Sequence, residues 1–265
     1  MPQVNTFQPP SRDRAFIESL LPAVERLLVP WHRATVGGFE HWPDEPVLVV
    51  GNHSGGSYTG DTWIFAAALF RARGFDALPF GLAHDLALKL PLVRDFLRRV
   101  GCVAADPTVC VELLRAGHNV MVYPGGDHEA LRPYRERNRV KFGGRRGYIR
   151  TALRAGVPIM PLASHGAHGT FIVLDDLPRL GRALGAERFL RMKAFPLALS
   201  VPWGLTLGPT LPYLPLPCRM SLQILPPIRF ERTGTEAALD EAYVLACAQL
   251  VEARLQEAMD ARTKT

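Results

Sequence analysis

The sequence lacks the patterns that place a chain in several common classes of protein. Its four cysteines form no CxxC pair, so we expect neither a disulfide framework nor a zinc site. Reduced thiols fit the cytoplasm. The first residues lack the basic and then apolar layout of a signal peptide, so secretion is not expected. These absences together predict a cytoplasmic protein.

An apolar segment that could form a spanning helix is also missing. Residues 194–218 carry no charge and are long enough to cross a bilayer, but they contain six prolines, which rule out a continuous helix. Without a helix, such a segment cannot satisfy its own backbone groups in lipid. We interpret it as an extended loop that is either sealed against the core or dipped into a membrane surface.

Sequence motifs of several enzyme classes are absent. There is no G-x-S-x-G segment, which disfavours a serine hydrolase of the α/β-hydrolase kind. Neither GxxxxGK[ST] nor a GxGxxG after a strand occurs, which disfavours nucleotide binding. His165 and His168 could share a metal ion, but no third ligand is evident nearby. We therefore expect no metal site.

Positive charge, by contrast, is in excess. The 31 basic and 25 acidic residues give a net charge of +6, a balance that suits nucleic acid, an anionic membrane surface or a phosphorylated substrate. No run interleaves basic and aromatic residues as a nucleic-acid groove would. We expect no nucleic-acid partner.

Residues 13–29 have the apolar periodicity of an amphipathic helix. Pro22 would kink this helix or split it into two short pieces. One interpretation packs the helix on the folded domain, and the other lays it on a membrane surface. We assign residues 1–35 to an amphipathic helical segment and residues 36–265 to one α/β domain.

The rest of the chain alternates short apolar strands with helices. Strands are expected within residues 47–50, 76–83, 102–106, 119–126, 157–163 and 219–230, and helices within residues 61–73, 86–101, 107–117, 147–156 and 235–260. The inward positions of the last helix are predicted to be Leu239, Tyr243, Ala246, Leu250 and Leu255. This order indicates an α/β fold, a single domain with a mostly parallel central sheet flanked by helices.

Polar or glycine-rich loops follow three of the predicted strands. They carry His53, the pair Gly125 and Gly126, and the pair Ser164 and His165. Right-handed crossovers bring the carboxyl ends of parallel strands to one edge of a sheet, where ligands bind. We therefore expect these loops to meet and to form the functional site.

His53 is the strongest candidate for a general base, because imidazole titrates near neutrality. Asp61 stands at the start of the next helix and could fix the tautomer of the ring. The alternative makes His53 a turn residue bonded to the backbone and Asp61 a helix cap.

A second candidate cluster lies in residues 123–146. Its two glycines let a ligand approach the backbone closely, and Glu129 follows them. Arg145 and Arg146 precede a predicted helix, where their charge and the helix dipole would favour a phosphate. A carboxylate beside basic residues suits a hydroxylated, phosphate-bearing substrate, and it equally suits a phosphate of coenzyme A.

Four blocks in this order, NHSGG…D, LPLVRDFLRRVG, YPGGDHEAL and GVPIMPL, resemble the glycerolipid and lysophospholipid acyltransferase superfamily. The resemblance is greatest to the branch related to diacylglycerol acyltransferases. It covers roughly residues 36–230. It implies acyl transfer from acyl-CoA or acyl-ACP, as co-substrate, to a lipid alcohol, without a cofactor, a metal or a covalent intermediate.

The resemblance also assigns roles to single residues. The HxxxxD-like motif of the family falls on His53 and Asp61, and its glycine- and glutamate-containing acceptor block falls on Gly125, Gly126 and Glu129. We predict that Asn52, Arg145 and Arg146 bind substrate together with these three residues. Seven residues separate the histidine and the aspartate, instead of the four of the common form. Gly125 also stands where the family usually has glutamate. These departures weaken an assignment to lysophosphatidate and leave room for neutral alcohols.

The favoured function is an O-acyltransferase bound peripherally to the inner face of the membrane. The N-terminal helix, Trp203 and Leu205 would contact the membrane. One alternative is a catalytically silent lipid- or acyl-chain-binding protein on the same fold. Another is an esterase or thioesterase that uses His53 and water.

Overall fold

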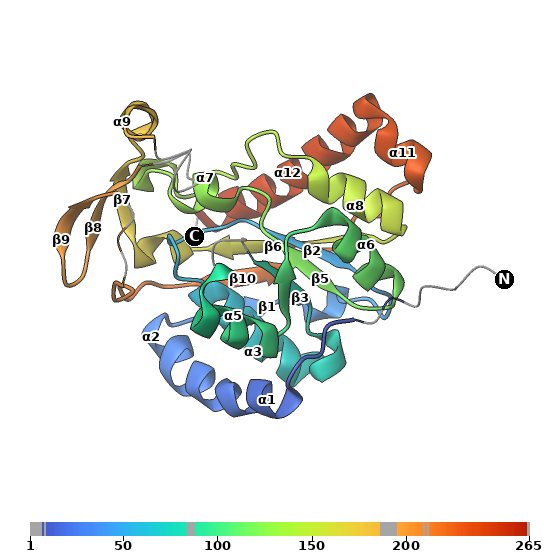
Figure 1. Ribbon diagram of the computed structural model, residues 1–265, viewed down its shortest axis with the longest axis horizontal. Coiled ribbons are helices and arrows are strands. Elements are labelled where there is room, and N and C mark those ends of the chain that lie inside the picture. The colour runs from blue at the N-terminus through green and yellow to red at the C-terminus, as the bar shows by residue number, and fades with distance from the viewer. Residues whose placement is uncertain are drawn as a thin grey trace.

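The central element of the computed structural model is a seven-stranded sheet (Figure 1). The structure describes residues 7, 9–83, 88–185, 195–208, 210 and 212–263. The strands in spatial order are β1 (Thr35–Gly37), β10 (Ser221–Ile224), β6 (Ile159–His165), β2 (Leu48–Gly51), β5 (Val120–Val122), β3 (Phe80–Ala83) and β4 (Cys102–Ala104). The five from β6 to β4 are parallel, whereas β10 is antiparallel to β6. The predicted fold class, a mostly parallel sheet, is confirmed.

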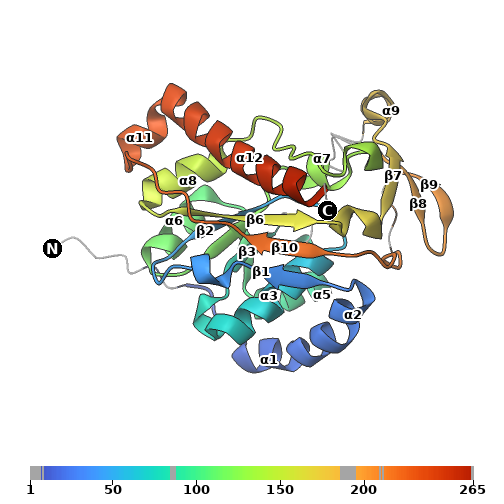
Figure 2. The same ribbon diagram turned by 180° about the vertical axis from the view of Figure 1, so that it is seen from behind.

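Helices cover both faces of this sheet (Figures 1 and 2). One face carries α1 (Arg14–Ala23), α3 (Gly60–Arg73) and α5 (Pro91–Arg99), and the other carries α6 (Pro107–Arg115), α8 (Gly147–Ala155), α11 (Thr235–Leu239) and α12 (Glu241–Thr263). Shorter helical turns are α7 (Gly126–Ala130), α9 (Pro178–Ala183) and the 3-10 turns Phe39–His41, Phe75–Ala77, Tyr134–Glu136 and Ala167–Thr170.

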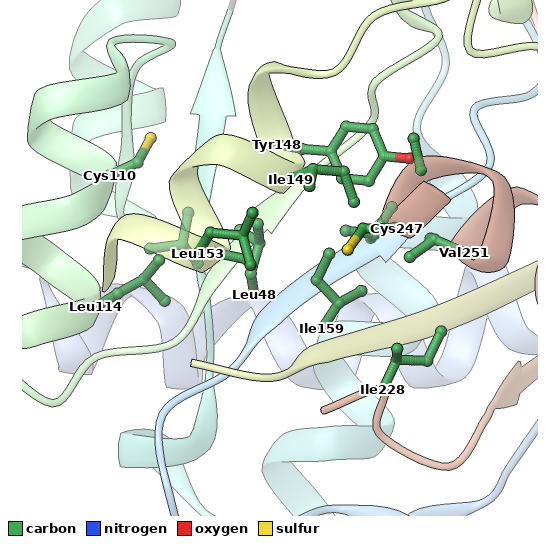
Figure 3. Packing of buried hydrophobic residues seen from close by; sticks show 14 of the residues in the cluster. Leu48, Cys110, Leu114, Tyr148, Ile149, Leu153, Ile159, Ile228, Cys247 and Val251 are labelled. Atoms are coloured by element: carbon green, nitrogen blue, oxygen red, sulfur yellow. The ribbon is translucent and has the colours of Figure 1, made fainter. Parts of the chain in front are cut away.

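Strand β2 is buried from both sides. Leu48 and Val50 face the core that α8 and α12 cover, which Figure 3 shows around Leu48, Ile159 and Val251. Val49 faces the opposite core, under α1 and α3. Because both faces are covered, the strand is apolar throughout, as is usual in parallel sheets.

The N-terminal helix continues past Pro22. After α1 the chain forms a π-helix, Val24–Leu28, and then α2, Val29–Trp31. Ile17, Leu21 and Val24 are buried against the protein. A π-turn is a common response where a helix must absorb an interruption. The prediction of a helix is confirmed, and one side of it packs on the domain.

Two predictions for the C-terminal helix were wrong. The helix breaks at Asp240, whose backbone is extended and whose side chain accepts a hydrogen bond from the Tyr243 N–H. Leu239 and Leu250 are exposed, as is Ala246. Leu255 is buried as predicted, and Tyr243 is half-buried against the core. The other buried positions are Val244, Cys247, Ala248, Val251 and Met259. Because α12 begins afresh after the break, its inward face does not continue that of α11.

A second, smaller sheet replaces the loop expected in the uncharged segment. It is antiparallel and consists of β7 (Ile172–Asp175), β8 (Leu197–Ser200) and β9 (Gly204–Leu207). A tight turn through Pro202 joins β8 to β9. The expectation of an extended loop was therefore wrong for residues 197–207. Part of the predicted helix 86–101 lies outside the described residues, and α5 begins at Pro91, where a break was expected.

No helix in the described part of the chain combines the length and the apolarity needed to cross a membrane.

The four cysteines are free. Burial raises the pKa of Cys102 and Cys110 to about 11, and that of Cys218 to about 12. Burial also raises the pKa of Cys247.

Candidate active site

The loops after β2 and β5 meet at the carboxyl edge of the sheet, as predicted. The backbone N–H of His53 donates a hydrogen bond to Glu129 Oε2 at 2.8 Å. The loop after β6 joins them, because His168 Nε2 lies 2.6 Å from the carbonyl oxygen of Arg132. Three segments far apart in the sequence therefore surround the histidine.

The His53 ring lies on Tyr123. The two ring centroids are 4.8 Å apart with planes inclined by 26°. Burial, and then the charge of Arg132, lower the pKa of His53 to about 4. The imidazole is therefore neutral near pH 7 and able to accept a proton. Its Nδ1 accepts the N–H of Ser54 at 3.1 Å.

The main chain of His53 is held on both sides. Glu129 accepts its N–H, and Arg132 donates from Nη1 to its carbonyl oxygen at 2.7 Å. Arg132 is fully buried and also bonds Ser54, Glu136 and Arg137. Nothing in the sequence distinguishes Arg132 from the basic residues that surround it. Its role depends on burial, which a run of charged residues does not reveal.

Both oxygens of Glu129 bond backbone N–H groups. Oε2 accepts from His53, and Oε1 accepts from Lys141 at 2.9 Å. The side chain is fully buried, and burial raises its pKa to about 7 against the opposing charge of Arg132. A Cβ on Gly125 would lie 2.4 Å from Glu129 Oε2. Glycine at 125 therefore makes room for a carboxylate that enters from four residues later.

Asp61 is buried at the first turn of α3. Its Oδ2 accepts the Ser164 hydroxyl at 2.8 Å, and its Oδ1 accepts the Thr62 N–H at 2.9 Å. Burial raises its pKa to about 6, although these two hydrogen bonds oppose the shift. Within the described part of the chain, no hydrogen bond joins Asp61 to His53. Tyr123 contacts both regions, because its ring stacks on His53 and its hydroxyl lies 2.6 Å from Oγ1 of Thr62, the residue after Asp61.

Asn52 fastens β2 to β6. Its Oδ1 accepts the Ser164 N–H at 2.7 Å, and its Nδ2 donates to the Ser164 carbonyl at 2.9 Å. The side chain is fully buried. The structure therefore uses this amide internally, and it positions the strand end that carries His53.

Tyr213 holds the loop between the two motif residues. Its hydroxyl donates to the Gly55 carbonyl at 2.8 Å and accepts the Tyr58 N–H at 2.8 Å. A Cβ on Gly56 would lie 2.9 Å from the same hydroxyl oxygen. The longer spacing of seven residues between His53 and Asp61 thus forms a loop with its own anchor. Nothing in the sequence singled out Tyr213.

Arg145 and Arg146 precede α8 as predicted, and Arg146 is its N-cap residue. Nη1 of Arg145 donates to the carbonyl oxygens of Pro124 and Gly125, at 3.0 and 2.9 Å. A Cβ on Gly126 would lie 2.6 Å from the same nitrogen. Arg145 therefore stabilises the turn at Gly125 and Gly126. A phosphate bound there would share the guanidinium with the backbone carbonyls of Pro124 and Gly125.

An apolar cavity of about 470 Å³ begins at His53 and runs under the N-terminal helix. Its walls come from α1, α3, α5, β3 and β5, and include Leu20, Leu21, Trp63, Ala66, Leu82, Val93, Leu97 and Met121. The polar groups of the lining are His53, Ser57, Thr59, Thr62 and Tyr123. A cavity with one polar end and a long apolar body suits an acyl chain with its reactive carbon at the histidine.

Among the described residues, no three histidine, cysteine or acidic side chains stand close enough to hold a metal ion. His168 bonds the backbone at both ring nitrogens, since Nδ1 accepts the Gly55 N–H at 3.5 Å. Burial lowers its pKa to about 3, so the ring is neutral. It therefore braces the His53 loop.

The family model for acyltransferases matches residues 33–165, half of the chain. The chain belongs to the acyltransferase family. The matched region of this acyltransferase contains His53, Asp61 and Glu129. His168 and Tyr213, which hold the His53 loop, lie outside it.

Curated relatives are about one third identical to this acyltransferase. An uncharacterized protein of Mycobacterium tuberculosis is 30% identical over 183 residues, which cover 67% of this chain and 49% of the relative. The human DGAT1/2-independent enzyme synthesizing storage lipids is 32% identical over 163 residues, 61% of this chain and 45% of that protein. The acyltransferase chain thus spans about half the length of the curated relatives it matches.

The fold of this acyltransferase is shared with a solved enzyme. The crystal structure of the 1-acyl-sn-glycerophosphate acyltransferase of Thermotoga maritima matches with a TM-score of 0.56 and 18% identity, over 96% of this chain and 85% of that chain. At this identity the match establishes the common fold, a mostly parallel sheet flanked by helices.

Proposed function

We propose that this acyltransferase moves a fatty acyl group from an acyl thioester, acyl-CoA or acyl-ACP, to the hydroxyl of a glycerolipid or another lipid alcohol. The observation that carries the proposal is the apolar cavity whose polar end holds His53. An acyl chain bound in this cavity would have its thioester carbon beside a neutral imidazole. A relative named for the synthesis of storage lipids supports a lipid acceptor.

In the proposed reaction His53 is the general base. The acceptor hydroxyl attacks the thioester carbonyl carbon and gives its proton to the imidazole, the carbon–sulfur bond breaks, and the departing sulfur takes the proton as a free thiol. Nδ1 of His53 accepts the Ser54 N–H in the present arrangement. To accept a proton at Nε2, the ring needs its proton at Nδ1, and a carboxylate such as Asp61 would stabilise that tautomer.

The surroundings of His53 favour a neutral acceptor. The lining of the cavity contains no charged side chain. The two nearest candidates for a phosphate ligand are engaged, since Arg132 and Arg145 both donate to backbone carbonyls. We therefore propose an uncharged lipid alcohol, and a phosphorylated acceptor is the alternative.

Release of free thiol from acyl-CoA, with and without lipid alcohols, tests the proposal. We expect release that depends on the acceptor and is abolished by His53→Ala, while Asp61→Asn lowers it by about two orders of magnitude or more. His41→Ala, which alters a histidine that does not line the cavity, is the matched control. Activity of His53→Ala within a few-fold of the unmutated protein would overturn the mechanism. Release without any acceptor would identify a thioesterase, and no release with any pair of substrates would identify a silent lipid-binding protein.

The substrates also determine where the enzyme works. A donor and an acceptor with long chains reside in or beside membranes, so we propose peripheral association with the inner face of the membrane from the cytoplasm. No nucleic acid and no cofactor enter this proposal.

A further inference from the structure

The small sheet turns an apolar face to solvent. Leu199 on β8 lies opposite Leu205 on β9, and Leu197 lies opposite Leu207. Leu199, Leu205 and Leu207 are 45%, 63% and 55% exposed. An antiparallel sheet with one covered face normally turns polar residues outward. This sheet carries leucines on the outer face, which marks an interaction surface.

The inner face of the same sheet is packed normally. Val173 and Ala198 are buried there with Phe171 and Leu131. The exposure of the leucines is therefore not the result of a sheet that stands away from the protein. Both faces are apolar, and one of them has no covering in the described part of the chain.

Two exposed tryptophans lie in segments connected to this sheet. Trp203 lies in the β8–β9 turn, and Trp31 lies at the end of α2, with 55% and 50% of their surfaces exposed. The indole N–H of Trp31 donates to the Pro215 carbonyl, which links the N-terminal helix to the segment that follows β9. We call Trp31, Leu199, Trp203, Leu205 and Leu207 the docking face. Tryptophan is enriched where proteins meet the interface of a bilayer.

The charges near this face are mostly positive. Among the described residues that flank the small sheet, Arg179, Arg182 and Arg219 are basic, and the acidic ones are Asp176 and Asp175, of which Asp175 is paired with Arg135. Beside Trp31, Arg26 and Arg33 are exposed, while Glu25 is paired with Arg71. Anionic headgroups are attracted to such a border. A second copy of this chain would bring the same positive charge and be repelled.

We propose that the docking face binds an anionic lipid surface. The leucines and tryptophans enter the interfacial layer, and the basic border contacts the headgroups. Figures 1 and 2 show β7, β8 and β9 beyond the carboxyl ends of the parallel strands. His53 follows the carboxyl end of β2 by two residues and so lies at the same end of the molecule. Docking by this face therefore presents the site to the lipid.

The small sheet also touches the reactive loop. Tyr213, which holds Gly55 and Tyr58, packs against Phe171 and the inner face of the sheet. The segment that bears the docking face on one side thus supports the His53 loop on the other. This inference rests on the proposed function insofar as the lipid surface supplies the acceptor.

Co-sedimentation with vesicles tests the proposal, using phosphatidylcholine alone and mixed with phosphatidylglycerol. We expect the unmutated protein to bind the anionic vesicles, less so as salt is added, and Trp203→Ala/Leu205→Asp to weaken this binding by about tenfold or more. Leu239→Asp is the matched control, because Leu239 is 62% exposed and lies on α11 at the opposite end of the molecule (Figure 1). Equal binding by the double variant and the control would overturn the proposal.

Two further measurements separate the outcomes. If sedimentation velocity shows a dimer that the double variant loses, the docking face is a contact between two copies and the lipid proposal fails. His53→Ala should bind vesicles like the unmutated protein while it releases no thiol. The double variant should keep thiol release with a detergent-dispersed acceptor and lose it with a vesicle-borne one. Loss with both would overturn the assignment of this face to docking.

Discussion

At the scale of single residues, the position of the candidate base His53 depends on neighbouring side chains that hold its main chain. The backbone of His53 is fixed by Glu129 at its N–H and by Arg132 at its carbonyl. Because both oxygens of Glu129 accept backbone N–H groups, we predict that Glu129 positions His53 and does not bind the acceptor.

The substitution Glu129→Gln tests this positioning role. An amide offers one acceptor where the carboxylate offers two, so the His53 or the Lys141 N–H loses its partner. We expect kcat to fall by about 10²-fold, with the KM values of donor and acceptor nearly unchanged. Glu112→Gln on the exposed side of α6 is the matched control. A raised KM for the acceptor with an intact kcat would instead support direct contact between Glu129 and the acceptor.

We expect the buried carboxyl of Asp61 to lower the stability of the fold at neutral pH, although the proposed mechanism requires it. Its pKa is about 6 in the fold against 3.8 as the reference, so the folded protein holds this proton more tightly than the unfolded chain. This contribution is fully present below about pH 4 and is lost as pH rises through about 6. Asp61→Asn removes that dependence.

Between pH 5 and pH 8 the unmutated protein loses the last part of this stabilisation, which corresponds to about one pKa unit or on the order of 1.4 kcal/mol. We therefore expect Asp61→Asn to gain this much stability relative to the unmutated protein over the same interval. Urea unfolding at the two pH values measures the gain. A relative stability that stays constant or falls over this interval would contradict a raised pKa.

At the scale of helices and strands, the central α/β pattern was predictable because local signals agree with the fold. Strand β2 is a continuous apolar run, and α6 has Asp106 as its cap and Pro107 at its first turn. The β8–β9 hairpin was missed because its outward leucines erase the alternation that marks a half-buried strand. The inward face of α12 was predicted correctly at Leu255 but wrongly at Ala246 and Leu250. The break at Asp240 was missed because no glycine or proline marks it.

The N-terminal helix forms a wall of the cavity, which changes how its removal should be interpreted. Ile17, Leu20, Leu21 and Val24 line the cavity. Deleting residues 1–30 would open the cavity as well as remove the proposed membrane contact of the helix. Substitutions on the outer side, at Leu27 or Trp31, distinguish the two roles, because these residues are 66% and 50% exposed.

A substitution in α3 tests whether the cavity receives the acyl chain. Ala66 lines the cavity, and Ala68 lies on another side of the same helix. We expect Ala66→Phe to raise the KM for long-chain donors by about tenfold or more and to spare short-chain donors, because the new ring fills the channel. Ala68→Phe is the control. An unchanged preference for chain length would place the chain elsewhere.

At the scale of the whole molecule, the sequence predicted which segments meet but not how their polar groups are used. Parallel topology brings the loops of His53 and Glu129 to one edge, and that could be inferred from strand order alone. The engagement of Asn52 with Ser164 and of Arg132 with five partners depends on distances between segments up to 112 residues apart. Such pairings leave no periodic trace in a single sequence.

Because the pKa values of its cysteines are raised, the folded protein should contribute little signal to an assay that detects free thiol. Thiolate is the form that reacts with disulfide reagents, and with pKa values of about 11 to 12 the thiols of Cys102, Cys110 and Cys218 remain protonated at pH 8. We expect slow colour development when a chromogenic disulfide is added to the folded protein and rapid reaction after denaturation. A fast signal in the presence of acyl thioester and alcohol then reports turnover, so the enzyme can be followed continuously, without separation of lipids and without replacing any cysteine.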